Sequence, residues 1–316
     1  MPAPFTRASL GGGPAFVTFN GATLFLRDDL DSKHAPEFNP VRSSLIGQVD
    51  KTKKDLVIRN TLTLFGLFTD LTVLFPSWLL NPTPGTHIYG ASDLPLVIQA
   101  RNNDVITYHN TQITRLANLH LGVDNELFAA AVEFTSIIAN GANPEDAAAY
   151  FTRSTSVYAA PAALVLTNFV KTRWTGAWTG KTGFTSFVGK RGFDVSWDAD
   201  IVSGEGQAGY VEGWGTCDMV LGEGTMMARC RALPIGPTMA QTDTAQGVTA
   251  AHGGLLSAGG ADLTLTGGSH SVVLKNAALV ESATVFGVEP LRAGEAVWEA
   301  TRVVTAGVPA AVATVT

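Results

Sequence analysis

Residues 93–138 read DLPLVIQARNNDVITYHNTQITRLANLHLGVDNELFAAAVEFTSII, and residues 262–304, DLTLTGGSHSVVLKNAALVESATVFGVEPLRAGEAVWEATRVV, repeat their pattern. Each stretch is typical of three strands separated by a polar turn and a glycine turn, because apolar residues recur at every second position. The stretches lie about one domain length apart, so the sequence predicts an internal duplication. The alternative is that two unrelated antiparallel meanders share this pattern.

The predicted alignment of the two stretches contains small gaps. It matches Asp93-Leu94 with Asp262-Leu263, Leu96 with Leu265, Asn110 with Asn276, Gly122-Val123-Asp124 with Gly287-Val288-Glu289, and Glu133, Thr135 and Ile137 with Glu299, Thr301 and Val303.

The composition predicts a mainly β protein. Of the 316 residues, 46% are hydrophobic and only 15% charged, which argues against disorder. Thirty-three glycines, together with many valines and threonines, favour strands and turns over helices. The length accommodates two domains, each with its own core. No apolar signal core and no run of 18 apolar residues occurs, so we expect a soluble chain that is not secreted.

Charge and cysteine content limit the possible partners. The net charge is −6 and no run of lysine and arginine exceeds two residues, which argues against a protein that grips a phosphate backbone. Nucleic acid could still slide past such a surface. Cys217 and Cys230 flank Gly222-Glu223-Gly224, a predicted hairpin turn that would place the thiols on adjacent strands. A disulfide is conceivable, but two reduced core thiols are favoured in a cytosolic protein.

The pattern divides the chain into four segments. We expect an N-terminal arm at 1–14, a first β domain at 15–139, a linker with a short helix at 140–162, and a second β domain at 163–316. Asn20-Gly21 predicts a hairpin. Pro76 is expected to kink or divide a helix whose apolar stripe is core packing. That stripe consists of Leu71, Leu74, Phe75, Trp78 and Leu79.

Residues 28–54 interrupt the first domain with a long polar segment that contains Pro36 and Pro40. The segment is too long for an ordinary connection in a compact domain. Its apolar residues favour a loop that is ordered by a neighbouring subunit, since a solvated loop would not carry them. The candidate contact residues are Phe38, Val41, Leu45 and Ile46.

The sequence predicts neither catalytic, cofactor-binding nor metal-binding residues, and therefore no enzyme. The six histidines show no metal-ligand spacing, and neither a Gly-x-Ser-x-Gly elbow nor a P-loop occurs. Residues 204–209 match the dinucleotide-binding pattern, but a predicted strand follows them in place of the helix that a phosphate needs.

Residues 192–203, GFDVSWDADIVS, show the clearest alternation in the chain. Phe193, Val195 and Trp197 are expected to face the core, and Asp194, Asp198 and Asp200 the opposite side. Carboxylates that alternate along one strand lie about 7 Å apart, so they form a row and no chelating cage. We interpret the row as a solvated acidic stripe, which gains importance if that face lines a channel.

GKRGFDVSWDADI (189–201), followed by a hairpin, a short helical segment and a strand–turn–strand ending in Glu-x-Thr, resembles the tail tube proteins of long-tailed bacteriophages and phage-like particles. The resemblance covers most of both halves and is one of pattern and order. It implies a mainly β fold with two tandem tube-like domains, each a small β-sandwich or split barrel with a short helical segment.

The resemblance further implies a structural subunit of a viral tail tube. In that family, sheets from six domains join edge to edge into a barrel, and rings stack into a tube that conducts DNA during ejection. Where a subunit carries two such domains, three subunits can form a pseudo-sixfold ring, so a trimer is favoured over a hexamer. The implied partners are further copies of the chain, other tail proteins, and DNA that passes without specific binding, with no cofactor and no membrane. The implied location is the virion tail, after assembly in the host cytoplasm.

Physical reasoning agrees with this implied assembly. Open sheet edges aggregate unless they are paired, and a closed ring pairs each one with a neighbour. A loop that reaches the next ring would explain residues 28–54. An acidic lumen would repel phosphate, so that DNA slides. The candidate lumen-facing residues are Asp194, Asp198, Asp200 and Arg59.

The first half departs from this scheme, because its corresponding strand carries Asp55, Arg59 and threonines. Either the lumen alternates in charge, or the 194–200 face is not the lumen. Two alternatives remain. A tail hub, baseplate or tail-terminator protein has the same fold, and a β-sandwich glycan-binding module would use Trp174, Trp178 and Trp214 as a platform.

Overall fold

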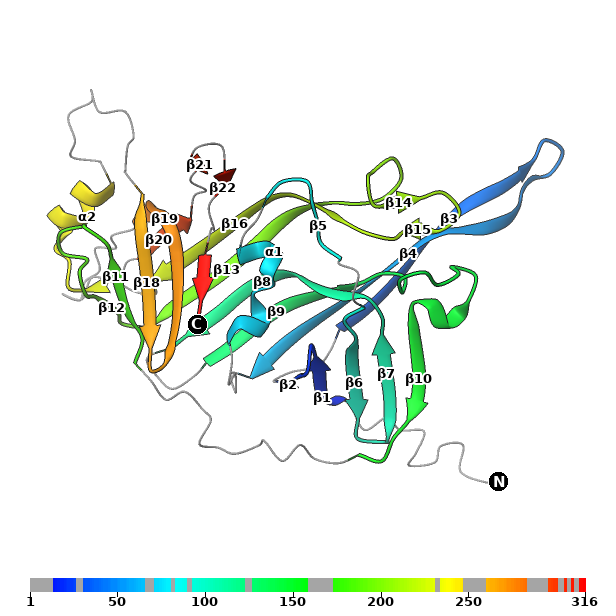
Figure 1. The fold of residues 1–316 in the computed structure, drawn as a ribbon, viewed down its shortest axis with the longest axis horizontal. Coiled ribbons are helices and arrows are strands. Elements are labelled where there is room, and N and C mark those ends of the chain that lie inside the picture. Colours follow the sequence, from blue (N-terminus) through cyan, green and yellow to red (C-terminus); the bar gives the residue numbers. More distant parts are fainter. Residues whose placement is uncertain are drawn as a thin grey trace.

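The chain folds into one large antiparallel sheet of 17 strands with two short α-helices (Figure 1). The structure is a computed structural model that describes residues 14–26, 31–65, 71–80, 83–89, 93–122, 127–158, 173–230, 234–246, 260–282, 295–300, 304–305, 308–309 and 313–316. The prediction of a mainly β protein is confirmed.

Strands from the first half of the chain form two groups. One is paired in the order β2–β1–β6–β7–β10 and the other in the order β3–β4–β9–β8. The short strand β5 pairs instead with β16 of the second half. The bounds are β1 Pro14–Phe19, β2 Ala22–Leu26, β3 Asp31–Ser43, β4 Gly47–Phe65, β5 Thr86–His87, β6 Leu96–Ala100, β7 Asp104–Tyr108, β8 Thr111–Leu121, β9 Leu127–Ser136 and β10 Phe151–Thr155.

Strands from the second half also form two main groups, in the orders β11–β18–β19–β23 and β13–β16–β20–β19. Three small two-stranded sheets accompany them, β12–β17, β14–β15 and β21–β22. The bounds are β11 Thr175–Trp178, β12 Val188–Gly189, β13 Phe193–Val202, β14 Tyr210–Val211, β15 Gly215–Thr216, β16 Val220–Cys230, β17 Pro234–Ile235, β18 Ala261–Gly267, β19 His270–Ser282, β20 Ala296–Ala300, β21 Val304–Thr305, β22 Val308–Pro309 and β23 Ala313–Val315.

The two halves repeat the same pairing order, and two local features recur with it. Asn110 precedes β8 and Asn276 lies within β19, and both have a positive φ, of 41° and 47°. The ladders to β9 and β20 then shift register directly after Ile113 and after Leu279. These landmarks align the halves residue by residue.

The register corrects the alignment predicted for the flanking strands by two residues. Leu96 lies opposite Tyr108, two residues before Asn110, and Leu263 lies opposite Leu274, two residues before Asn276. Leu96 therefore corresponds to Leu263 and not to Leu265. A shift of two keeps every side chain on the same face of a strand, so the alternation alone could not have detected it.

A direct join connects the β3–β4–β9–β8 group to the β13–β16–β20–β19 group. β8 pairs with β13, from Leu121 opposite Phe193 to Arg115 opposite Asp198. The core is continuous beneath the join, because the Trp197 indole donates to the Leu74 carbonyl at 3.1 Å and packs edge-on against Trp78. The halves of the chain therefore share one sheet and one core.

The helix predicted around Pro76 is present and divided, as expected. Pro76 separates the 3-10 helix η1 (Leu71–Leu74) from α1 (Ser77–Leu80), and the predicted apolar stripe is buried. α2 spans Met239–Gln246 within the glycine-rich segment of the second half. The turn at Asn20-Gly21 is also confirmed, since β1 and β2 pair across it and both residues have positive φ.

The helix expected in the 140–162 linker is only one turn long. Asp146 caps the 3-10 helix η2 (Ala147–Ala149), and β10 follows immediately and pairs with β7. Residues 151–155 form a strand because they pair with the open edge of β7 in the first half's sheet. The alanine-rich sequence before them did not reveal this pairing. Residues 159–162 of the predicted linker lie outside the described residues, as do residues 1–13.

The loop predicted at residues 28–54 is wrong. Residues 31–54 form the outer part of a long β-hairpin. β3 and β4 pair from Asp31 opposite Thr61 to Ser43 opposite Gly47, and the hairpin extends well beyond the rest of the sheet (Figure 1). Pro36 and Pro40 are tolerated because β3 is an edge strand, whose outward N–H groups have no ladder partner to lose. We call residues 36–54 the arm.

The hairpin predicted around residues 222–224 is wrong, because β16 continues through them and pairs with β13 on both sides of a register shift at Gly222. Cys217 therefore precedes the strand and Cys230 ends it, at opposite ends of the same segment. Neither cysteine is in a disulfide, as favoured. Burial raises the pKa of Cys217, and raises that of Cys230 from 9.0 to about 12.

Candidate functional site: the polar sheet face and the arm

One face of the central strands covers the core and the other carries charged side chains, which we call the polar face. Phe193, Val195 and Trp197 of β13 are buried as predicted, so the intervening aspartates point the other way. Neighbouring strands add arginines and further carboxylates to this face. Its members are Arg59, Arg115, Glu133, Asp194, Asp198, Asp200, Glu223, Thr225, Arg229 and Glu299.

The three aspartates of β13 lie in a row, but their surroundings differ. The Asp194 carboxylate lies 2.8 Å from Nδ1 of His120, and only 13% and 10% of these two side chains are exposed. Asp198 and Asp200 are exposed, and Asp198 forms an ion pair with Arg115 at 3.3 Å. Asp194 is thus a buried partner of the neighbouring strand, and only the other two present carboxylates to solvent.

Arg59 and Asp198, predicted to face one lumen, do lie together. Both line a shallow depression of about 180 Å³ with Arg115 and Glu133, and Arg59 lies 3.8 Å from Glu133. Charges of both signs therefore alternate across the join between the halves, and carboxylates outnumber arginines. The arrangement is a mixed surface with an acidic excess and not a uniform acidic stripe.

The arm carries five of the ten exposed large apolar side chains of the described residues, including the most exposed one, Leu45. Leu45 is 91% and Ile46 76% exposed at its tip, and Phe38, Val41 and Val49 are each exposed by 40% or more. All four predicted contact residues thus lie on one projecting element. Covering these apolar side chains would lower the free energy, so the arm is a candidate surface for a protein–protein contact.

Three successive residues fix the base of the arm. The Asp55 carboxylate, itself buried, accepts from the Thr216 amide at 2.8 Å, from the Thr216 hydroxyl, and from the Leu56 amide at 2.8 Å. Lys54 forms an ion pair with Glu205, whose hydrogen bond raises the pKa of Lys54.

The third residue at the arm base, Lys53, binds the opposite side. It donates to the Pro144 carbonyl at 3.0 Å and lies 4.2 Å over the ring of Tyr150. Burial raises the pKa of Tyr150 to about 12. The base of the arm is therefore held by two segments that are far apart in the sequence.

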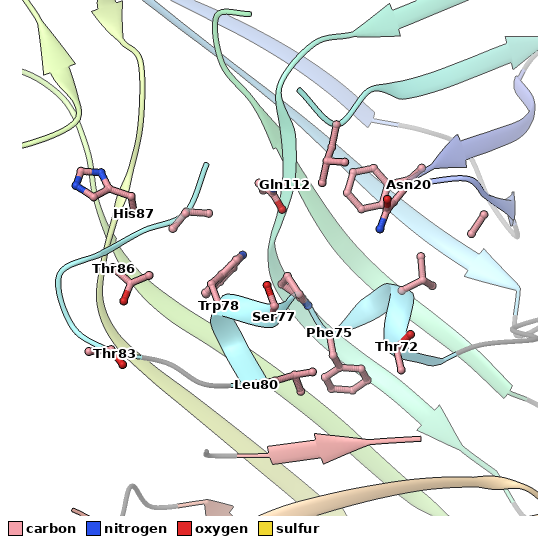
Figure 2. A pocket seen from close by; sticks show the side chains of 16 residues that line it. Asn20, Thr72, Phe75, Ser77, Trp78, Leu80, Thr83, Thr86, His87 and Gln112 are labelled. Carbon is pink, nitrogen blue, oxygen red and sulfur yellow. The ribbon is translucent and has the colours of Figure 1, made fainter. Parts of the chain in front are cut away.

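A groove of about 800 Å³ lies beside α1, between the β1–β2 turn and β5 (Figure 2). Aromatic and uncharged polar side chains line it, among them Phe19, Trp78, Asn20 and Gln112, and His87 is the one ionisable residue of the described lining. The described lining therefore suits an uncharged group better than a phosphate.

His87 is paired with Asp218 at 2.6 Å, a geometry that also occurs between catalytic bases and the carboxylates that orient them. Ser77 lines the same groove, but the His87 ring points away from it, with Trp78 between them (Figure 2). The three residues therefore do not form a nucleophile–base–acid chain in this structure.

The tryptophan platform predicted for a glycan-binding module is wrong. Trp174 and Trp178 are each 1% exposed, and only Trp214, at 42%, reaches the surface. The Trp178 indole donates to two backbone carbonyls, and its ring packs against Phe184 and Trp298. These rings build the second half's core, a role that their glycine-rich sequence context did not reveal.

Among the described residues, no three histidine, cysteine, aspartate or glutamate side chains are close enough to hold a metal ion. None of the helices found there is long and apolar enough to cross a membrane. No protein-family model matches the chain, and no curated protein sequence matches it.

Proposed function

We propose that the chain is a structural subunit whose copies join edge to edge into rings that stack into a tube, as in the tail tube proteins its sequence resembles. The observation that carries this proposal is the β8–β13 join, which connects two strand groups of the same pairing order within one chain. Since this pairing joins two strand groups of the same order within one chain, the equivalent edges can pair in the same way between copies.

The repeated pairing order supports two tandem tube-like units. β1, β6, β7 and β10 of the first half correspond in order to β11, β18, the first part of β19, and β23, and the asparagine and register shift recur at matching positions. This correspondence supports duplication more strongly than the sequence pattern, because pairing order does not follow from alternation.

Each of the joined groups ends in an outer edge with which no described strand pairs. These edges are the outer side of β3, and residues 278–281 of β19 on the side away from β20. By the correspondence, β3 occupies the place of β13, and the end of β19 occupies that of β8. We expect β3 of one copy to pair with β19 of the next.

The internal join predicts the register of this contact. Asp198 lies opposite Arg115, and the corresponding residues are Ala35 on β3 and Glu281 on β19. Paired residues on adjacent strands bring their Cα atoms within disulfide range. An Ala35→Cys/Glu281→Cys variant should form disulfides between copies on oxidation, and the largest covalent product would report three or six chains per ring.

A matched control uses Ala35→Cys/Glu145→Cys, since Glu145 is exposed in another part of the chain. Negative-stain microscopy of the unmodified protein should show rings or long hollow tubes. A protein that stays monomeric at high concentration, with no cross-linked product from the Ala35/Glu281 pair, would sink the proposal.

The arm provides the contact between rings in this proposal. Transfer of one Leu or Ile side chain out of water is worth about 1.5–3 kcal/mol, so Leu45 and Ile46 together favour stacking by roughly 3–6 kcal/mol. A Leu45→Asp/Ile46→Asp variant should raise the concentration needed for stacking at least about a hundredfold. Val157→Asp, at an equally exposed valine, is the control.

The polar face is the proposed lumen, past which DNA slides during ejection from a virion tail. Its excess of carboxylates supports sliding over tight binding, because phosphate is repelled. The same fold at the end of a tube would serve as a hub, baseplate or terminator protein. Microscopy distinguishes these, since only a tube subunit polymerises without a preformed end.

A further inference from the structure

We infer that Asp55, Lys54 and Lys53 form a clamp that sets the direction of the arm relative to the sheet. The inference deepens the proposed function, in which the arm contacts a second copy, and its direct test does not depend on assembly. A two-stranded hairpin that projects alone into solvent is marginal by itself and swings at its base unless it is held there.

The buried carboxylate is the centre of the clamp. Asp55 belongs to β4, whereas both Thr216 donors come from the loop between β13 and β16, in the other half of the chain. Hydrogen bonds to a charged acceptor are stronger than those between neutral groups. The contact therefore ties the hinge of the arm to the second half.

The loop is shaped to reach this carboxylate. Gly215 has φ +83°, and a Cβ atom there would lie 2.6 Å from the Asp55 carboxylate oxygen. Glycine is thus required both by the backbone conformation and by the close approach. The backbone at Gly215 is therefore shaped for the Asp55–Thr216 contact, which is more than an incidental surface contact.

The lysines restrain the hinge from different sides. Lys54 pairs with Glu205 of the connection between β13 and β16, whereas Lys53 reaches Pro144 and Tyr150 of the connection between β9 and β10. Restraints on both sides remove bending in either direction. An arm whose direction is preset loses less freedom on contact with a second copy, which favours binding.

Electron paramagnetic resonance can measure the direction of the arm in the full chain. Ketone-bearing amino acids placed at Leu45 and at Thr179, both exposed, would carry nitroxide labels without using the native cysteines, and dilution with unlabelled protein isolates distances within one chain. The unchanged clamp should give a single narrow distance peak. Asp55→Ala should lose that peak and give a broad distribution.

Asp50→Ala is the matched control, because Asp50 is an exposed carboxylate of the same strand that accepts a hydrogen bond from the adjacent Lys51 amide. It should keep the narrow peak. If Asp55→Ala does not fold, Thr216→Val combined with Glu205→Gln should broaden the peak instead. A narrow peak in every folded clamp variant, or a broad peak with the clamp intact, would overturn the inference.

Assembly then separates the two proposals. If the clamp variants lose the narrow peak and stack less regularly than the control, both stand. If neither the unmodified protein nor any variant assembles, the proposed function fails while the distance measurements still decide the clamp.

Discussion

Replacing the aspartates of β13 one at a time should reveal how differently a single row of carboxylates is used. Asp194→Ala removes a hydrogen bond with His120 that is almost enclosed, at 2.8 Å. A hydrogen bond to a charged group contributes about 1.5–3 kcal/mol, and the imidazole left behind is buried without this partner. We therefore expect the free energy of unfolding to fall by about 2 kcal/mol.

The other two positions serve as internal controls. Asp198 and Arg115 are 61% and 54% exposed, and such a surface pair contributes only about 0.2–1 kcal/mol. Asp200→Ala, at an exposed carboxylate, should stay within about 0.5 kcal/mol of the unmodified protein. Asp194→Asn, which keeps a side-chain acceptor, should fall between Asp194→Ala and Asp200→Ala.

Urea unfolding followed by tryptophan fluorescence measures these differences, because Trp197 lies on the same strand and is buried. Equal denaturant slopes among the variants would show that the changes reflect stability. If Asp194→Ala costs no more than Asp200→Ala, the enclosed His120–Asp194 contact contributes nothing to the join between the halves, and our account of the join is wrong.

Three further results are expected. The buried Cys230 thiol should resist a thiol reagent at pH 8 until urea is added. Its pKa in the folded protein, about 12, exceeds the ordinary value of 9.0, so the unfolded chain loses this proton at lower pH. The free energy of unfolding should therefore decline as pH rises between these two values. Gly176→Ala should cost roughly 1–3 kcal/mol in thermal or urea unfolding, because the new Cβ would lie 2.5 Å from the Phe187 ring, whereas Gly180→Ala meets no atom and pays only for its positive φ. Asp198→Lys/Asp200→Lys should slow DNA passage through assembled particles without preventing assembly; unchanged delivery would refute the polar face as the lumen. Asp194→Lys is unsuitable for that test, since it would bury an ammonium group beside His120.

The sequence by itself determined the local structure wherever one residue or one alternation is decisive. Asn20-Gly21 predicted the first hairpin, Pro76 the division of the helix, and the alternation from Phe193 to Trp197 the buried face of β13. These signals succeed because they depend on the backbone conformation or the pleat of a single segment. The same reasoning located the exposed apolar residues of the arm, although it predicted a loop there.

Only the tertiary structure decided which strands pair and in which register. The arm is a hairpin because the polar parts of β3 and β4 supply each other's backbone hydrogen bonds. Neither segment shows this pairing in its own sequence. β16 passes through three residues that predicted a turn, because pairing with β13 continues on both sides of a register shift at Gly222 and satisfies the backbone there. The hydrogen bonds of Asp194 with His120 and of Asp55 with Thr216 join residues far apart in the chain. Which residues meet in this way depends on the register in which the strands pair, and a period-two pattern fits every register shifted by two.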